Sequence, residues 1–109
     1  MISLFYKEFE LGVLFFDNDS NEFVYNSNIE NEKKADEKYF GLELYNLFGS
    51  KNRRSKNLFL QFCEIAGCLN RPDIVRMAGI KKGDSLYQKL EKLSMLKLND
   101  EDYFIRFKK

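Results

Sequence analysis

The stretch ISLFYKEFELGVLFFDNDSNEFVYN, residues 2–26, says most about the fold, because apolar and polar residues alternate along much of it. Three strands are expected, over residues 2–6, 9–17 and 22–26. The central strand is expected to bury mainly one face, which carries Phe9, Leu11, Val13 and Phe15. Short polar runs separate the strands and are typical of tight turns. The N-terminal part of the chain therefore predicts an antiparallel meander.

A change of spacing in the second half of the chain predicts three short helices, over residues 57–67, 71–78 and 85–94. Apolar residues recur there at the spacing that places them on one face of a helix. Ser85 and Gln88 fit a capping box at the start of the third helix.

The remaining segments are less regular. Residues 27–38 are dense in charge and are expected to form a solvated loop, whereas residues 39–48 fit a strand and a helix equally well. Residues 49–57 are expected to form a basic loop. Residues 95–98 and 103–107 flank an acidic turn and predict a closing hairpin. The expected fold is α+β, with an N-terminal antiparallel β meander, three short helices and a C-terminal β hairpin.

Composition predicts one domain that spans residues 1–109. The chain has 44% hydrophobic residues, enough for a packed core, and its 18 basic residues nearly balance 17 acidic ones. No overall field therefore draws it to nucleic acid or to a membrane. No apolar run reaches the length of a bilayer span, and no signal-peptide core follows Met1. Cys63 and Cys68 are interpreted as reduced and packed, in a cytoplasmic protein.

The sequence contains no pattern that indicates catalysis. It has no histidine, no glycine-rich phosphate loop and no cluster of acidic residues with recognisable metal-ligand spacing. Two cysteines without a histidine do not complete a zinc site. We therefore predict that the protein is not an enzyme, and we predict no catalytic residue, no cofactor and no metal ligand.

The three helices and the hairpin follow the order of a winged-helix domain. In that interpretation residues 85–94 form the recognition helix and residues 99–102 the tip of the wing. The helix offers Gln88, Lys89 and Lys92 to DNA, but no arginine, which is the commonest reader of guanine. The wing tip, Asn-Asp-Glu-Asp, would repel phosphate. A winged-helix DNA-binding transcriptional regulator is therefore the alternative function, and binding to nucleic acid is not expected.

Two parts of the chain resemble the N-terminal subdomain of HipA-type toxin kinases. The first has a hydrophobic-Gly-x-Leu element and an F-x-Y strand, made by Gly12, Leu14, Phe23 and Tyr25. The second is a run of three helices whose matching residues are Leu58, Phe59, Phe62, Arg71, Ile74, Val75, Asp84, Leu90 and Leu93. The chain departs from the family in its middle segment, where the family has an extended stretch that ends in Leu-Pro and this chain has Leu42-Glu43-Leu44-Tyr45 without proline. The family's second Leu-Pro, after the LF helix, is also missing.

The resemblance implies a stand-alone, HipS-like module without the kinase. In that family the N-terminal subdomain precedes a kinase core, which holds the ATP-binding and catalytic residues. Some toxin–antitoxin operons of this type encode the module as a separate small protein that binds and restrains the kinase. The implied function is that of a non-catalytic, antitoxin-like protein that binds and regulates a HipA-type kinase.

The predicted partner-binding surface is the segment 39–56, where aromatic residues run into a basic cluster. Aromatic side chains anchor protein interfaces, and basic ones meet acidic patches. The predicted contact residues are Tyr39, Tyr45, Phe48, Lys51, Arg53, Arg54 and Lys56. A second copy of the chain, in a homodimer, is an alternative partner. Phe104 and Phe107 point to opposite faces of the last strand, so one of them is expected at the surface.

Overall fold

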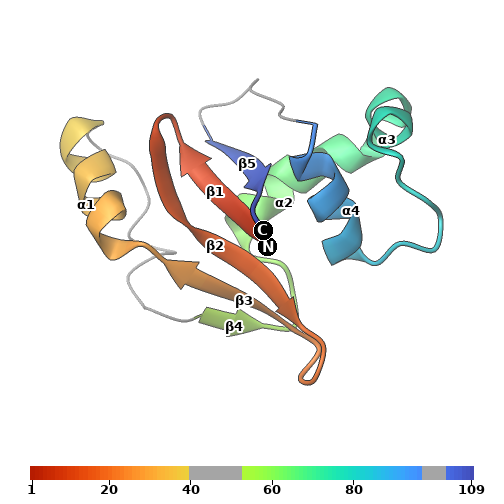
Figure 1. The fold of residues 1–109 in the computed structure, drawn as a ribbon, viewed down its shortest axis with the longest axis horizontal. Coiled ribbons are helices and arrows are strands. Elements are labelled where there is room, and N and C mark those ends of the chain that lie inside the picture. The colour runs from red at the N-terminus through yellow and green to blue at the C-terminus, as the bar shows by residue number, and fades with distance from the viewer. Residues whose placement is uncertain (40–52, 97–102) are drawn as a thin grey trace.

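The computed structural model describes residues 1–39, 53–96 and 103–109 (Figure 1). Its centre is one sheet of five antiparallel strands in the order β4-β3-β2-β1-β5. The strands are β1 (Ile2–Tyr6), β2 (Phe9–Asp17), β3 (Glu22–Ser27), β4 (Arg53–Ser55) and β5 (Tyr103–Phe107). The predicted N-terminal meander is confirmed, and the last strand returns to pair with the first.

The helices form two groups that contribute to the same core cluster. They are α1 (Ile29–Lys38), α2 (Leu60–Ala66), the 3-10 helix η2 (Gly67–Asn70), α3 (Pro72–Ala78) and α4 (Leu86–Ser94). In Figure 1, α1 lies at one side, whereas α2, α3 and α4 lie together at the other. The three helices predicted in the second half of the chain are confirmed, and so is the α+β class.

The core lies between one face of the sheet and the helices. Its largest fully buried side chains on the sheet include Ile2, Leu4, Leu14 and Tyr25. Each of the four α-helices adds at least one buried apolar side chain from its inner face; these are Ala35, Phe62, Ile74, Leu90 and Leu93. Burying one large apolar side chain stabilises a fold by roughly 1.5–3 kcal/mol, so this shared cluster holds the sheet and the helices together.

A β-bulge changes which residues of β2 face the core. Leu4 pairs with Gly12 and Phe5 pairs with Glu10, so Leu11 is an extra residue without a partner on β1. Leu11 and Leu14 are both fully buried, although they are an odd number of positions apart. The prediction that Val13 and Phe15 share the buried face with Leu11 is therefore wrong, since the pleat shifts by one residue at the bulge.

Residues 27–38 form a helix for most of their length, so the prediction of a loop there is wrong. The side chain of Asn28 accepts a hydrogen bond from the Asn31 backbone N–H at 3.1 Å, which caps the start of α1. Glu30 and Glu32 stand in the first turn and Lys38 in the last, as the helix dipole favours. Only Ala35 supplies a fully buried apolar contact, so the helix has almost no apolar stripe to reveal it.

The predicted closing hairpin is described only in part. Its second strand is confirmed as β5, which pairs with β1 along its whole length. Met95 and Leu96, predicted to begin the first strand, form instead the turn that ends α4. Residues 97–102 lie outside the described residues, and so does the ambiguous segment from residue 40 onward.

Gly12 leaves space that the side chain of Tyr25 occupies. A Cβ atom at position 12 would collide with the Tyr25 hydroxyl and with the Asn26 carbonyl oxygen. Tyr25 is fully buried, and its ring packs edge-on against Phe62 of α2, with centroids 5.8 Å apart. Burial raises the pKa of Tyr25, and the nearby Glu32 carboxylate adds to the effect. Gly12 therefore allows the sheet to present Tyr25 to α2.

We expect Gly12→Ala to lower the free energy of unfolding by about 1–3 kcal/mol, because the new methyl group has no room. Gly83→Ala is a matched control, since a Cβ atom there has no heavy atom within 4 Å. Chemical denaturation of both variants and the wild type measures the effect. Equal stability of Gly12→Ala and Gly83→Ala would contradict the close packing of Tyr25 on Gly12.

Candidate functional site

The structure places four of the seven predicted contact residues. Tyr39, Arg53, Arg54 and Lys56 are described, whereas the predictions on Tyr45, Phe48 and Lys51 lie outside the described residues. The four side chains differ in their surroundings, and two of them are engaged within the chain.

Tyr39 anchors the end of α1 to the β1–β2 turn. Its hydroxyl donates a hydrogen bond to the Glu8 carboxylate at 2.7 Å, and its ring packs edge-on against Tyr6 with centroids 5.5 Å apart. Lys38 also binds Glu8, with 2.6 Å between Nζ and Oε1. The hydrogen bond from Lys38, followed by the one from Tyr39, lowers the pKa of Glu8 to about 2. Tyr39 therefore holds the fold together and is not a free aromatic anchor.

The predicted basic loop 49–57 contains a strand, so the expectation of a continuous loop is wrong. Arg53 and Arg54 lie in β4, which pairs with β3. The Arg54 guanidinium forms an ion pair with Asp17 at 3.0 Å and approaches Glu22 at 4.0 Å. The hydrogen bond from Arg54 lowers the pKa of Asp17. Lys56 is exposed just beyond the strand.

A hollow of about 320 Å³ lies where η2, α3 and α4 meet. Its lining divides into apolar side chains and lysines: Leu69, Val75, Ile80, Lys81, Lys82 and Lys89. Among the described residues, no ion pair joins any of these three lysines to a carboxylate. We call this feature the lysine-rimmed hollow.

The end of α3 sets the direction of the loop that carries Lys81 and Lys82. Gly79 has a left-handed backbone, with φ of 71°, and ends the helix. Its N–H donates to the Arg76 carbonyl oxygen at 3.2 Å, and the Ile80 N–H donates to the Val75 carbonyl oxygen at 3.1 Å. This pair of bonds is the Schellman motif. It fixes Ile80 beside Val75 in the wall of the hollow.

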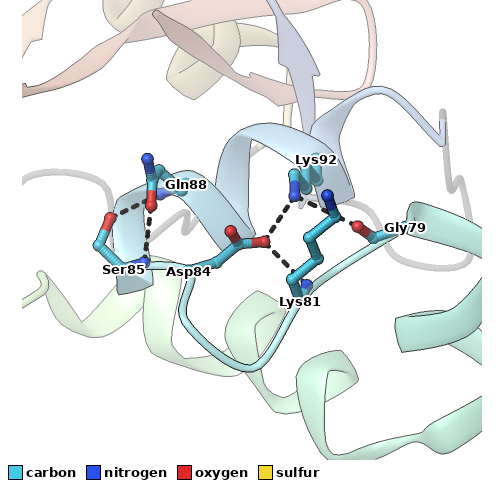
Figure 2. Close-up of polar contacts among 6 residues, drawn as sticks. All are labelled: Gly79, Lys81, Asp84, Ser85, Gln88 and Lys92. Atoms are coloured by element: carbon cyan, nitrogen blue, oxygen red, sulfur yellow. Dashed lines mark hydrogen bonds and ion pairs between the residues drawn. The ribbon is translucent and has the colours of Figure 1, made fainter.

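Asp84 ties the other end of this loop to α4 (Figure 2). Its Oδ2 atom accepts hydrogen bonds from the Lys81 backbone N–H at 2.9 Å and from Lys92 Nζ at 2.6 Å. Lys92 Nζ also donates to the Gly79 carbonyl oxygen at 3.2 Å. The bond from Lys81 and then the one from Lys92 lower the pKa of Asp84. The loop is therefore held at its start and at its end.

The capping box predicted from the sequence is confirmed at the start of α4. Ser85 Oγ accepts from the Gln88 backbone N–H at 3.2 Å, and Gln88 Oε1 accepts from the Ser85 N–H at 2.8 Å (Figure 2). Leu90 and Leu93 bury the inner face of the helix. Lys89 is thereby placed on the same side as the loop lysines.

The hollow was not predicted as a site. The spacing of Val75 and Leu69 is that of ordinary core residues, and both are half-buried. A signal in the sequence was the Lys81-Lys82 pair between two predicted helices. It does not show by itself whether the two charges find acidic partners within the fold.

We expect Glu8→Gln to lower the melting temperature at pH 7, because the carboxylate that binds Lys38 and Tyr39 is lost. The depressed pKa makes this contribution fully present above the unfolded-state value near 4.5 and lost as the pH falls through about 2. The melting temperatures of variant and wild type should converge over that range.

Glu30→Gln serves as its control, since Glu30 pairs with Lys34 on the exposed side of α1. Thermal melts followed by circular dichroism measure both variants. A constant difference between Glu8→Gln and wild type from pH 7 down to pH 2 would contradict the assigned role of Glu8.

We expect Asp84→Ala to speed hydrogen exchange at the Lys81 amide, because its acceptor is removed and the loop loses its tie to Lys92. The melting temperature should change little, since solvent screens a partly exposed ion pair. Asp73→Ala removes an exposed ion pair to Arg71 and should leave exchange at Lys81 unchanged. Unaltered exchange in Asp84→Ala would show that the loop is ordered by other contacts.

The described residues hold no group of three or more histidine, cysteine, aspartate or glutamate side chains that could bind a metal ion. Cys63 is exposed, contrary to the expectation that it is packed, and Cys68 is half-buried; both are free thiols. Within the described ranges, no helix combines the length and the apolar character needed to cross a bilayer. Comparisons with models of protein families, with curated proteins and with solved structures found no match to the chain.

Proposed function

We propose that the protein is a non-catalytic protein-binding module that docks an acidic partner through the lysine-rimmed hollow. The observation that carries the proposal is the set of three lysines on an ordered loop and helix around apolar side chains; none of these lysines forms an ion pair with a carboxylate among the described residues. Protein interfaces combine an apolar centre with a polar rim, which is the arrangement that the hollow offers.

The fixed conformation of the loop between α3 and α4 favours binding. Asp84 and Gly79 hold the segment between α3 and α4 in place, so a partner meets lysines whose backbone is already positioned. Preorganisation lowers the entropic cost of association. Since the whole chain has a net charge of only +1, attraction of an acidic partner depends on local clustering of this kind.

The proposed partner is a HipA-type kinase, which the chain would bind and regulate as an antitoxin-like module. This class rests on the resemblance in sequence to the N-terminal subdomain of such kinases. The segment 39–56 remains a predicted second contact through Arg53 and Lys56 and through the residues outside the described ranges. Tyr39 and Arg54 give it less support, because both are bound to acidic side chains of the chain itself.

A winged-helix DNA-binding regulator is the second candidate. The order of α2, α3 and α4 followed by β5 favours it. Two of the three side chains expected to contact DNA are engaged elsewhere, however: Gln88 caps α4 and Lys92 binds Asp84. Only Lys89 of that set lines the hollow, so protein binding is the better supported function.

We expect Lys81→Glu/Lys82→Glu to weaken binding to a purified HipA-type kinase from the same genome by about tenfold or more, mainly through slower association. Lys33→Glu/Lys109→Glu reverses two charges at exposed sites away from the hollow and should bind like wild type. Surface plasmon resonance at two salt concentrations measures both variants.

The same proteins are tested in a gel shift with duplex DNA from the chain's own promoter. Kinase binding that is unchanged in Lys81→Glu/Lys82→Glu would exclude the hollow as the contact. Sub-micromolar, sequence-selective binding to the DNA, lost in that variant, would favour the winged-helix function instead.

A further inference from the structure

We propose that the lysine-rimmed hollow takes a single large apolar side chain from an acidic amphipathic segment of the partner, whose flanking carboxylates pair with Lys81, Lys82 and Lys89. This inference rests on the proposed function and specifies the chemistry of the docked segment. It follows from the size of the hollow, the nature of its floor and the placement of its charges.

The hollow has room for a large anchor side chain. Its volume of about 320 Å³ is at the lower end of the roughly 300–1,000 Å³ found for small-ligand pockets. Leu69 of η2, Val75 of α3 and Ile80 of the following loop line it. Three separate elements thus provide apolar surface to one spot, which matches a large apolar side chain better than an extended surface.

The apolar floor of the hollow, made by Leu69, Val75 and Ile80, is attached to the core, so it is already formed before a partner binds. Leu69 packs against the core cluster, and Ile74 of α3 is buried within it. The Schellman motif at Gly79 fixes Ile80 relative to Val75. An incoming side chain therefore meets a preformed surface, and little conformational entropy is lost on the side of this protein.

The three lysines contribute to the apolar lining of the hollow and to its charged rim. Lys81, Lys82 and Lys89 line the hollow, and lysine side chains can cover apolar surface with their methylene stems while the ammonium groups stay in water. The acidic side chain of the loop, Asp84, binds the Lys81 backbone and Lys92 and also attracts the Lys81 ammonium group, so one carboxylate faces Lys81, Lys82, Lys89 and Lys92. The charge around the opening is therefore positive, and carboxylates of a partner complement it.

Nucleic acid and purely apolar ligands would each contact only the lysines or only the apolar floor. Nucleic-acid phosphates would pair with the lysines but leave Leu69, Val75 and Ile80 against water. A purely apolar ligand would leave the three ammonium groups without partners. An apolar side chain with acidic residues three or four positions away on a helix satisfies both parts, because those positions lie on one face.

The test uses the full chain and a short fluorescent peptide of alanine and glutamate with one central leucine, capped at both termini. Fluorescence polarisation should show saturable binding that weakens as salt is added. Lys81→Glu/Lys82→Glu should reduce affinity about tenfold or more, and Lys33→Glu/Lys109→Glu should not. Amide chemical-shift changes should centre on Ile80, Lys81 and Lys89.

A second peptide, with serine in place of the central leucine, tests the apolar anchor. We expect it to bind at least about fivefold more weakly, since the floor is then left without a partner. Equal binding of the two peptides would show attraction by charge alone and would overturn the inference. Stronger binding of duplex DNA than of the leucine peptide, competing for the same lysines, would also overturn it.

The outcomes separate this inference from the proposed function. If the kinase binds in a manner that depends on Lys81 and Lys82 but the two peptides bind alike, the anchor is wrong and the protein-binding function stands. If the leucine peptide binds as expected and the kinase does not, the site is supported and the class of partner is wrong.

Discussion

The fold depends on the single extra residue in β2. Because Leu11 has no partner on β1, its side chain enters the core, and its carbonyl oxygen accepts the Asn28 N–H at 2.8 Å just before α1. One residue on, Gly12 leaves the space that Tyr25 fills, and Tyr25 reaches Phe62 of α2. The bulge thus lies beside the contacts that hold α1 and α2 against the sheet, and a regular strand would point Leu11 away from the core.

The packing of η2, α3 and α4 then creates the lysine-rimmed hollow. Leu90 and Leu93 fix α4 on the sheet, and Ile74 fixes α3 against the same core. Because both helices are packed on the core, the loop between them is held at each end. Asp84 restrains the loop further by accepting hydrogen bonds from Lys81 and Lys92. The positions of the lysines are therefore a consequence of core packing, since the loop has no apolar contacts of its own beyond Ile80.

The periodicity of apolar residues predicted the helices and strands that have a clear apolar face. It failed where tertiary contacts, and not an apolar face, determine the secondary structure. The meander and α4 were predictable, since apolar and polar residues alternate along much of residues 2–26 and Ser85 with Gln88 signals a cap. The bulge was not, because a shift of one residue leaves the composition of the strand unchanged. α1 was missed because Ala35 is its one fully buried apolar residue and charges cover the rest. β4 was missed because its short length leaves no pattern to detect.

The candidate site was harder to predict than the fold, because a nearly neutral sequence does not show which charges are paired. Arg54 reads in the sequence as part of a basic cluster, yet Asp17, which is 37 positions away, binds it. Lys92 reads as a contact for a partner, yet Asp84 binds it. Lys81 and Lys82 form no such ion pair among the described residues. Pairing depends on which carboxylates the tertiary structure brings within reach, so the charge available to a partner is a property of the folded chain.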